Sequence, residues 1–252
     1  MNLKYDVPKR PLELKRTHDY CAVKSPKLTV VFVHGIAADS SSFARAIDYL
    51  EGTTSLRAVR FVAYDLLGSG KSYASDKLEY NYAEQIEALH NSILKLKLTT
   101  PLVPVGHSMG TLIVTRYADT YKKSVKQLIL ISPPVYTEGD LMNPAFAKAT
   151  EAFRDAVGVK NRKILETKAF NCSMGKIVLN KRNYRVLADL KTCAVLIYGT
   201  LDPIIGAHNI PKVLKENPKY LTAIKTEGRH SVSRDKYSKV VGILEGVLNE
   251  IS

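Results

Sequence analysis

Residues 101–117 read PLVPVGHSMGTLIVTRY and join a short apolar run to a segment of helical character. Between the two lies Gly106-His107-Ser108-Met109-Gly110, a G-x-S-x-G pattern. A serine on a tight strand-to-helix turn needs small flanking residues, because larger ones would collide with the neighbouring strand and helix. The start of the following helix also favours negative charge beside the serine. The stretch therefore predicts a reactive Ser108 at the end of a strand.

Similar apolar runs recur along the chain. Each is short, rich in β-branched residues and followed closely by a glycine, proline or aspartate, which is typical of strands buried on both faces. We predict strands over residues 28–33, 58–64, 101–106, 126–132, 193–198 and 220–226. Residues 12–24, LELKRTHDYCAVK, are expected to add an antiparallel hairpin at one edge of the sheet.

Segments with helical periodicity separate these runs. The clearest spans residues 80–97, where Ile86, Leu89, Ile93 and Leu96 share one face. Further helices are expected over 44–50, 109–121 and 234–250. This alternation predicts an α/β fold, with a mostly parallel central sheet and helices on both of its faces.

Residues 134–189 interrupt the alternation, since they contain no convincing strand and their helix-like stretches break at Pro144, Gly158 and Gly175. We interpret them as a small helical insertion, here called the cap segment. Residues 1–133 and 190–252 then form the core. The cap segment is expected either to cover a site or to pack as ordinary surface helices. Its apolar Phe146, Phe153, Phe170 and Met142 are the expected lining of a substrate pocket.

A serine hydroxyl is a poor nucleophile at neutral pH, so Ser108 needs a base and an orienting carboxylate. Both should follow later strands, because parallel strands end at one edge of the sheet. Asp202 follows CAVLIYGT, and His230 follows YLTAIKTEGR. The order Ser108, Asp202, His230 is the order used on the α/β-hydrolase scaffold. The other reading of these two residues is an ordinary turn aspartate and a surface histidine.

Acyl transfer also needs donors for the tetrahedral oxyanion, and backbone N–H groups serve because they are fixed before the reaction. Val33-His34-Gly35-Ile36 ends an early strand, where a turn would present the N–H of Ile36. The N–H of Met109, at the start of the helix after Ser108, is the second expected donor. His34 is then a structural residue.

Taken together, these segments resemble the α/β-hydrolase superfamily, in its compact esterase and haloperoxidase-like branch. The resemblance rests on VHGIAADSSSF, YDLLGSGKS, VGHSMG, YGTLDPIIG and EGRHS, which run in the family's order between residues 28 and 232. It implies the α/β-hydrolase fold, with Ser108 as nucleophile, Asp202 as triad acid and His230 as base. Ile36 and Met109 match the oxyanion donors, and the cap segment falls where the family places its cap.

Three further points of the resemblance concern one loop and two single positions. Residues 65–72, DLLGSGKS, match a family loop whose role is structural. Arg229 stands directly before the predicted base, where the family often has glycine. Pro104 lies in the strand before Ser108, where it cannot donate a ladder hydrogen bond, so a bulge or an early strand end is expected there.

The leading functional hypothesis is hydrolysis of carboxylic esters through an acyl-enzyme. Hydrolysis of C–C bonds or thioesters, or cofactor-free lyase chemistry, would use the same triad. A non-catalytic member of the fold that binds a ligand is the alternative of a different class. A phosphate loop is excluded at Gly70-Lys71-Ser72, because Asp65 stands where the pattern needs glycine. We expect no metal and no organic cofactor.

Composition limits the partners and the compartment. The net charge is +13, but the basic residues are spread out and do not alternate with aromatic ones, so no nucleic-acid partner is expected. No apolar run reaches the roughly 18 residues of a membrane span, and the first residues lack the apolar core of a signal peptide. Three cysteines without metal-ligand spacing favour a reducing, cytoplasmic setting. The expected partner is a small ester with an apolar portion. Oligomeric state is not predicted.

Overall fold

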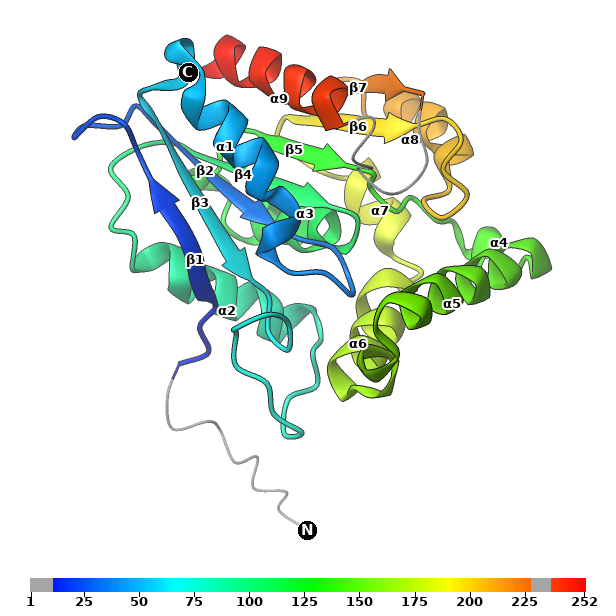
Figure 1. Cartoon of the computed structure of the whole chain (residues 1–252). Helices are drawn as coiled ribbons and strands as arrows, with labels where there is room; N and C mark the ends of the chain where they lie inside the picture. Colours follow the sequence, from blue (N-terminus) through cyan, green and yellow to red (C-terminus); the bar gives the residue numbers. More distant parts are fainter. Residues whose placement is uncertain (1–10, 228–236) are drawn as a thin grey trace.

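A computed structural model describes residues 11–227 and 237–252. Seven strands form one sheet in the order β1-β3-β2-β4-β5-β6-β7 (Figure 1). The edge strand β1 is antiparallel to β3, and the other neighbouring strands are parallel. The strands are β1 (Lys15–Tyr20), β2 (Leu28–Val33), β3 (Val59–Asp65), β4 (Leu102–His107), β5 (Leu128–Ile131), β6 (Ala194–Gly199) and β7 (Leu221–Thr226). The predicted α/β fold with a mostly parallel sheet is confirmed.

Helices cover both faces of the sheet because the strands present apolar side chains to both sides. Val30 and Phe32 of β2 belong to a core with α1 and α9, whereas Val31 and Val33 belong to a core with α2 and α3. The helices of the core are α1 (Ala44–Gly52), α2 (Tyr82–Leu94), α3 (Met109–Thr120), α8 (Ile210–Glu216) and α9 (Tyr237–Ile251). Short 3₁₀ turns are η1 (Ser40–Phe43), η2 (Thr54–Leu56), η3 (Lys122–Ser124) and η5 (Ala207–Asn209).

The N-terminal segment corrects one prediction. Residues 12–24 contribute a single strand, β1, rather than a hairpin. Strand β3 lies between β1 and β2 in the sheet, so β1 pairs with a distant strand and not with its neighbour in sequence. Lys15, for example, lies opposite Asp65. Pairing over that distance leaves no local sequence signal.

Pro104 is accommodated by a bulge, one of the two outcomes expected from the sequence. It stays within β4, opposite Val31 of β2. On the β5 side, Leu102 bridges Val125 whereas Val105 pairs with Ile129, so the partner has one extra residue across this gap. The missing N–H of the proline therefore falls where the ladder is interrupted.

Between β5 and β6 all the regular secondary structure of the described chain is helical. It forms α4 (Glu138–Leu141), α5 (Pro144–Glu166), α6 (Lys168–Ser173), the π-turn η4 (Met174–Val178) and α7 (Asn183–Ala188). Proline begins α5, where its missing N–H costs nothing. Gly158 does not break this helix; the backbone instead becomes extended at Asn161. No helix within residues 11–227 and 237–252 combines the length and the apolar character that crossing a bilayer requires.

The two halves of the cap segment differ in burial. Helices α4 and α5 contain no buried residue. In contrast, α6, η4 and α7 bury Phe170, Met174, Ile177, Tyr184 and Leu187, among others, in the core cluster that contains α2 and α3. Lys168–Ala188 is called here the inner half of the cap, and Glu138–Glu166 the outer half.

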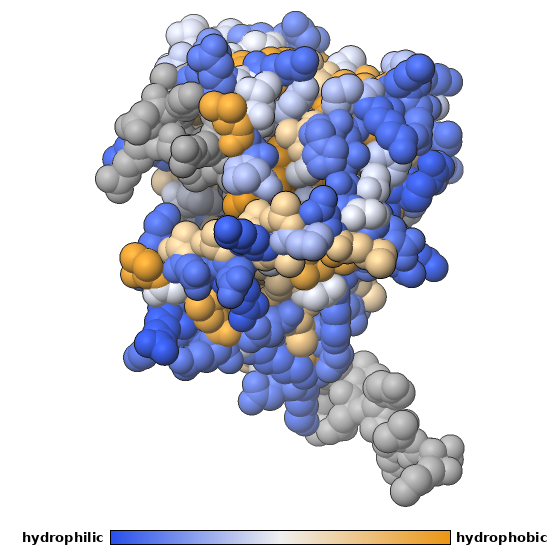
Figure 2. Space-filling view, turned by 90° about the vertical axis from the view of Figure 1, so that its right-hand side faces the viewer, coloured by the Kyte–Doolittle hydropathy of each residue, from blue (hydrophilic) through white to orange (hydrophobic). Residues whose placement is uncertain are grey.

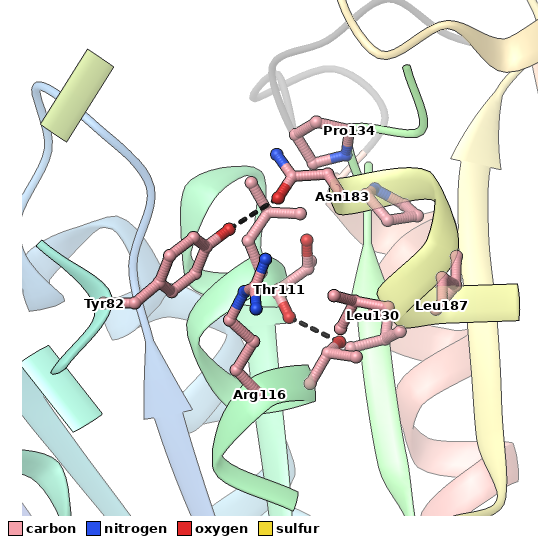
Figure 3. Close-up of a pocket in the computed structure, with 11 residues that line it drawn as sticks. Tyr82, Thr111, Arg116, Leu130, Pro134, Asn183 and Leu187 are labelled. Carbon is pink, nitrogen blue, oxygen red and sulfur yellow. Dashed lines mark hydrogen bonds between the residues drawn. The ribbon is translucent and has the colours of Figure 1, made fainter. Parts of the chain in front are cut away.

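A polar cluster fastens the inner half to the core (Figure 3). The Tyr82 hydroxyl of α2 donates to Asn183 Oδ1 at 2.7 Å. The guanidinium of Arg116, from α3, stacks on the Tyr82 ring at 4.0 Å. Three elements far apart in sequence thus meet in one cluster, which fixes α7 on the sheet's helices.

Hydrogen bonds attach the start of the outer half to the core. The Asp140 carboxylate of α4 accepts from Asn209 Nδ2 at 2.7 Å and contacts His208 Nε2 at 2.8 Å. It also accepts from the Thr137 hydroxyl and N–H. Burial opposes its ionisation, but these hydrogen bonds outweigh burial and lower the pKa of Asp140 to about 2.

Candidate active site

Ser108 occupies the sharp turn between β4 and α3. Its backbone has φ 49° and ψ −120°, a conformation that side-chain-bearing residues rarely adopt. The surroundings hold it there: Ser108 N donates to the Ile131 carbonyl at 2.9 Å, and the Ser108 carbonyl accepts from the N–H and hydroxyl of Thr111. The residue is only 6% exposed. The turn therefore holds Ser108 in one constrained and largely buried position.

The small residues beside the turn are required by close backbone contacts. A Cβ on Gly110 would lie 2.1 Å from the Val33 carbonyl oxygen. A Cβ on Gly106 would lie 2.6 Å from the Thr111 Cα. Both contacts are far inside van der Waals range, so helix α3 reaches the sheet only because these positions lack side chains.

The loop after β2 approaches the same serine. A Cβ on Gly35 would lie 3.1 Å from the Ser108 Cβ, so the backbone that leads into Ile36 runs beside Ser108. Ala37 has a positive φ of 56°, which turns the chain sharply after Ile36. On the other side, Met109 is the first residue of α3, where the N–H has no acceptor within the helix. Both predicted oxyanion donors thus flank Ser108.

His34 holds this loop in place. It is completely buried, and its Nε2 accepts from the Leu66 N–H at 2.9 Å. Because Nε2 is an acceptor, Nδ1 carries the proton and donates to the Gly35 carbonyl at 2.8 Å. Burial lowers the pKa of His34, which keeps the ring neutral in this arrangement. His34 is therefore a positioning residue for the loop that carries Ile36.

Asp65 ties two further loops to the end of β3. Its carboxylate accepts from Ser40 N at 2.9 Å and from Lys71 N at 2.8 Å. Burial opposes its ionisation, but these hydrogen bonds outweigh burial and lower the pKa of Asp65. A Cβ on Gly70, which has a positive φ, would lie 2.2 Å from the Asp65 carboxylate. The structural role expected for residues 65–72 follows from these contacts.

Asp202 lies in the turn after β6 and is only 6% exposed. Its Oδ1 accepts from Ile204 N at 2.9 Å, which orients the carboxylate. The predicted base, His230, lies outside the described residues. The chain leaves the described part at Glu227, directly after β7, and β7 pairs with β6 up to Thr226. Thr200 N donates to the Thr226 carbonyl at 3.1 Å, so the ends of the two strands that precede Asp202 and His230 are adjacent.

A large cavity of about 880 Å³ opens over Ser108. One wall is the sheet edge with Ile36, His107 and Ser108; the opposite wall is one face of α5. Figure 2 shows the side of the molecule where α5 lies, with a pale orange band of weakly hydrophobic residues crossing it. The α5 residues in this wall follow helical spacing: Ala145, Lys148, Ala149, Ala152, Phe153, Ala156, Val157 and Lys160. The described part of α9 adds a third wall.

A second, small cavity of about 20 Å³ lies deeper and also borders Ser108. Its walls are mostly apolar and come from the start of the cap segment, α5 and η4. Of the residues that the sequence predicted for substrate binding, Phe146 lines this cavity and Phe153 lines both.

Met142 and Phe170 are placed elsewhere. Met142 is 80% exposed, and Phe170 is buried in the core of the inner half. Neither lines the two cavities at Ser108. Conversely, Ile204, Tyr136 and the α5 alanines line them and were not predicted. The regular spacing of alanines in α5 could have indicated this wall, but the prediction was based on the larger and more hydrophobic side chains.

Residues 29–168 match the alpha/beta hydrolase fold family, and the chain belongs to it. A stretch of 121 residues, 48% of the chain, is 34% identical to the probable lysophospholipase BODYGUARD 5 of Arabidopsis thaliana. That match covers 27% of the relative, so the chain spans about a quarter of its length.

Two solved structures share the fold over nearly their whole length. An esterase from Exiguobacterium antarcticum has a TM-score of 0.70 over 93% of this chain and 94% of its own, at 18% identity. A bromoperoxidase from Bacillus anthracis has a TM-score of 0.69 over 97% of both chains, at 18% identity. The resemblance to the esterase and haloperoxidase-like branch is confirmed at the level of fold.

Proposed function

We propose that this chain is a serine hydrolase that cleaves carboxylic esters through an acyl-enzyme, with Ser108, His230 and Asp202 as its triad. The observation that carries the proposal is the strained Ser108 turn, which faces an apolar cavity beside the Gly35–Ile36 loop. Family membership and the esterase and lysophospholipase named above agree with ester chemistry. The cytoplasm is the proposed location, in keeping with three cysteines that form no disulfide.

Each residue has a defined task in this reaction. The Ser108 oxygen attacks the ester carbonyl carbon while its proton passes to His230, and Asp202 orients the imidazole. The N–H groups of Ile36 and Met109 donate to the oxyanion of the tetrahedral intermediate. The C–O bond then breaks, and the alcohol leaves with the proton from His230. Water attacks the acyl-enzyme and gives a proton to His230; the bond to the Ser108 oxygen then breaks, the acid is released, and His230 returns the proton to Ser108.

A fluorophosphonate probe tests the nucleophile and separates an enzyme from a ligand-binding member of the fold. We expect a covalent adduct on Ser108 of the full chain, located by peptide mass spectrometry, and turnover of p-nitrophenyl acetate. Labelling should weaken below about pH 6–7, because a protonated His230 can no longer accept the serine proton. A protein that stays unlabelled at neutral pH, or that labels at another serine, would contradict the proposal.

A further inference from the structure

Within the described part of the chain, Ser108 borders two cavities whose sizes differ greatly. The deep one measures about 20 Å³ and the open one about 880 Å³. Four residues are common to both linings: Ile36, Ser108, Phe153 and Ile204. The reacting carbonyl must sit at Ser108, so a substrate that places one substituent in the deep cavity leaves the other in the open one.

Much of the wall of the deep cavity belongs to the buried core. Tyr136 is almost completely buried, and its hydroxyl donates to the Ile204 carbonyl. The Phe146 ring packs edge-on against Tyr136 at 4.6 Å between centroids. Met174 and Val178 of η4 close the other side and are also buried. The Tyr136 and η4 sides of this cavity are therefore firmly held, and α5 supplies the remaining side with Phe146, Thr150 and Phe153.

The open cavity differs because its outer wall is α5, which contains no buried residue. Alanines recur along that wall and leave room at the helix surface. Its volume lies within the range of pockets that take ligands of several hundred daltons. A group of many carbon atoms therefore fits on this side.

The volume of the deep cavity limits what can enter it. A cavity of roughly 10–15 Å³ holds about one water molecule, so 20 Å³ admits a methyl or, at most, an ethyl group. Helix α5 contributes Phe146, Thr150 and Phe153 to this cavity, and of these Phe153 also lines the open one. The Phe153 ring thus partitions the space around Ser108.

We propose that the substrate is an asymmetric ester, with one substituent of one or two carbons in the deep cavity and a long apolar substituent in the open cavity. Phe153 enforces this asymmetry as a specificity-determining residue. The inference rests on the proposed function, since it concerns the substrate of the same Ser108 site.

Three isomeric eight-carbon esters test it at constant composition. Hexyl acetate carries its short group on the acyl side, methyl heptanoate carries it on the alcohol side, and butyl butyrate has no short group. One of the first two should show a kcat/KM at least about tenfold above that of butyl butyrate, because excess methylenes in a closed apolar pocket are strongly disfavoured. Whichever isomer is preferred assigns the deep cavity to the acyl or to the alcohol group. Equal rates for all three would overturn the proposal.

Two variants test whether Phe153 causes the selectivity among the three esters. Phe153→Ala joins the cavities and should raise the relative rate of butyl butyrate by about tenfold. Val157→Ala, one turn further along α5, lines only the open cavity and should leave the ratio unchanged. A ratio that shifts equally in both variants, or in neither, would contradict the role of Phe153. Phe153→Leu serves if the alanine variant does not fold.

A parallel assay with p-nitrophenyl acetate separates this inference from the proposed function. Turnover of that ester without discrimination among the three isomers would remove only the asymmetric-substrate proposal. Absence of any ester hydrolysis, together with an unlabelled Ser108, would remove both.

Discussion

The sheet-edge wall and the α5 wall of the open cavity are built in different ways. The sheet-edge wall, with Ser108 and the Gly35–Ile36 loop, is held by backbone contacts too close for an added methyl group. The α5 wall is a helix without a buried residue. Helix α4, which precedes it, is attached to the core at Asp140, and the well-buried inner half follows it in the chain. Chemistry needs atoms fixed to fractions of an ångström, whereas recognition of an apolar chain tolerates a less constrained surface.

The largest expected effect tests the sheet-edge wall directly. Ser108→Ala should lower kcat for p-nitrophenyl acetate by about 10⁴-fold or more, because no other group supplies the nucleophile. The melting temperature should not fall, since the hydroxyl is not needed for packing. Ser132→Ala is the matched control, because Ser132 also directly follows a strand and also has a positive φ, of 50°. Turnover retained in Ser108→Ala would refute the assigned nucleophile.

Gly110→Ala tests the close packing of the same wall. Its Cβ would meet the Val33 carbonyl oxygen, which is backbone and cannot turn away, so the free energy of unfolding should fall by about 3 kcal/mol or more. Gly175→Ala is the control, because a Cβ there meets nothing within 4 Å. Urea denaturation of both variants measures the difference. Similar midpoints would mean that the elbow is not as rigid as its contacts indicate.

A pair of identical substitutions compares the halves of the cap. Ile177→Ala, in the inner half, removes a fully buried side chain and should cost about 2–5 kcal/mol of unfolding free energy. Ile164→Ala, in α5, removes a half-buried one and should cost less than about 1 kcal/mol, partly because alanine favours the helix. Neither residue lines a cavity at Ser108. Equal losses would show that α5 is as firmly attached as the inner half.

The smallest effect concerns the attachment of the outer half at Asp140. A carboxylate whose pKa is lowered on folding stabilises the folded state above its unfolded pKa, and this contribution disappears as pH falls through the folded value. With a folded pKa of about 2, the stabilisation is lost between about pH 4 and 2. Asp140→Asn should therefore destabilise the protein by about 1–2 kcal/mol at pH 7.

Thermal melts at several pH values check this. The gap in melting temperature between the wild type and Asp140→Asn should narrow as pH is lowered from 7 to about 3. Glu138→Gln, a neighbouring exposed carboxylate of α4, should show no comparable gap. A gap that is constant over this pH range would rule out the ionised carboxylate as its source.

Sequence patterns located the central strands closely. The predicted run 28–33 coincides with β2, and the other five predicted runs differ from their strands by at most two residues at either end. Strands of a parallel sheet are buried on both faces, so each one is a continuous apolar run that is visible without its neighbours. The edge strand β1 is mostly exposed and lacks such a run, which is why its pairing was predicted wrongly.

The residues of the candidate site also differ in how well the sequence predicted their positions. Ser108, Ile36, Met109 and Asp202 were placed by motifs, because each lies within a few residues of a strand end whose position the sequence predicts. His230 remains a prediction, since it lies outside the described residues. The cap segment was recognised as helical, but its residues have no such reference point, and Met142 and Phe170 proved to lie outside the linings of both cavities.

By itself, the sequence determined the strand–helix alternation and predicted which residues at the strand ends would carry the chemistry, because both depend on local composition and spacing. Only the tertiary structure decided which face of α5 lies opposite Ser108 and how the space around Ser108 is divided between a deep and an open cavity. Those properties depend on the packing of Phe153, Tyr136 and Ile204. These residues come from separate segments of the chain and meet only after the cap segment has packed on the sheet.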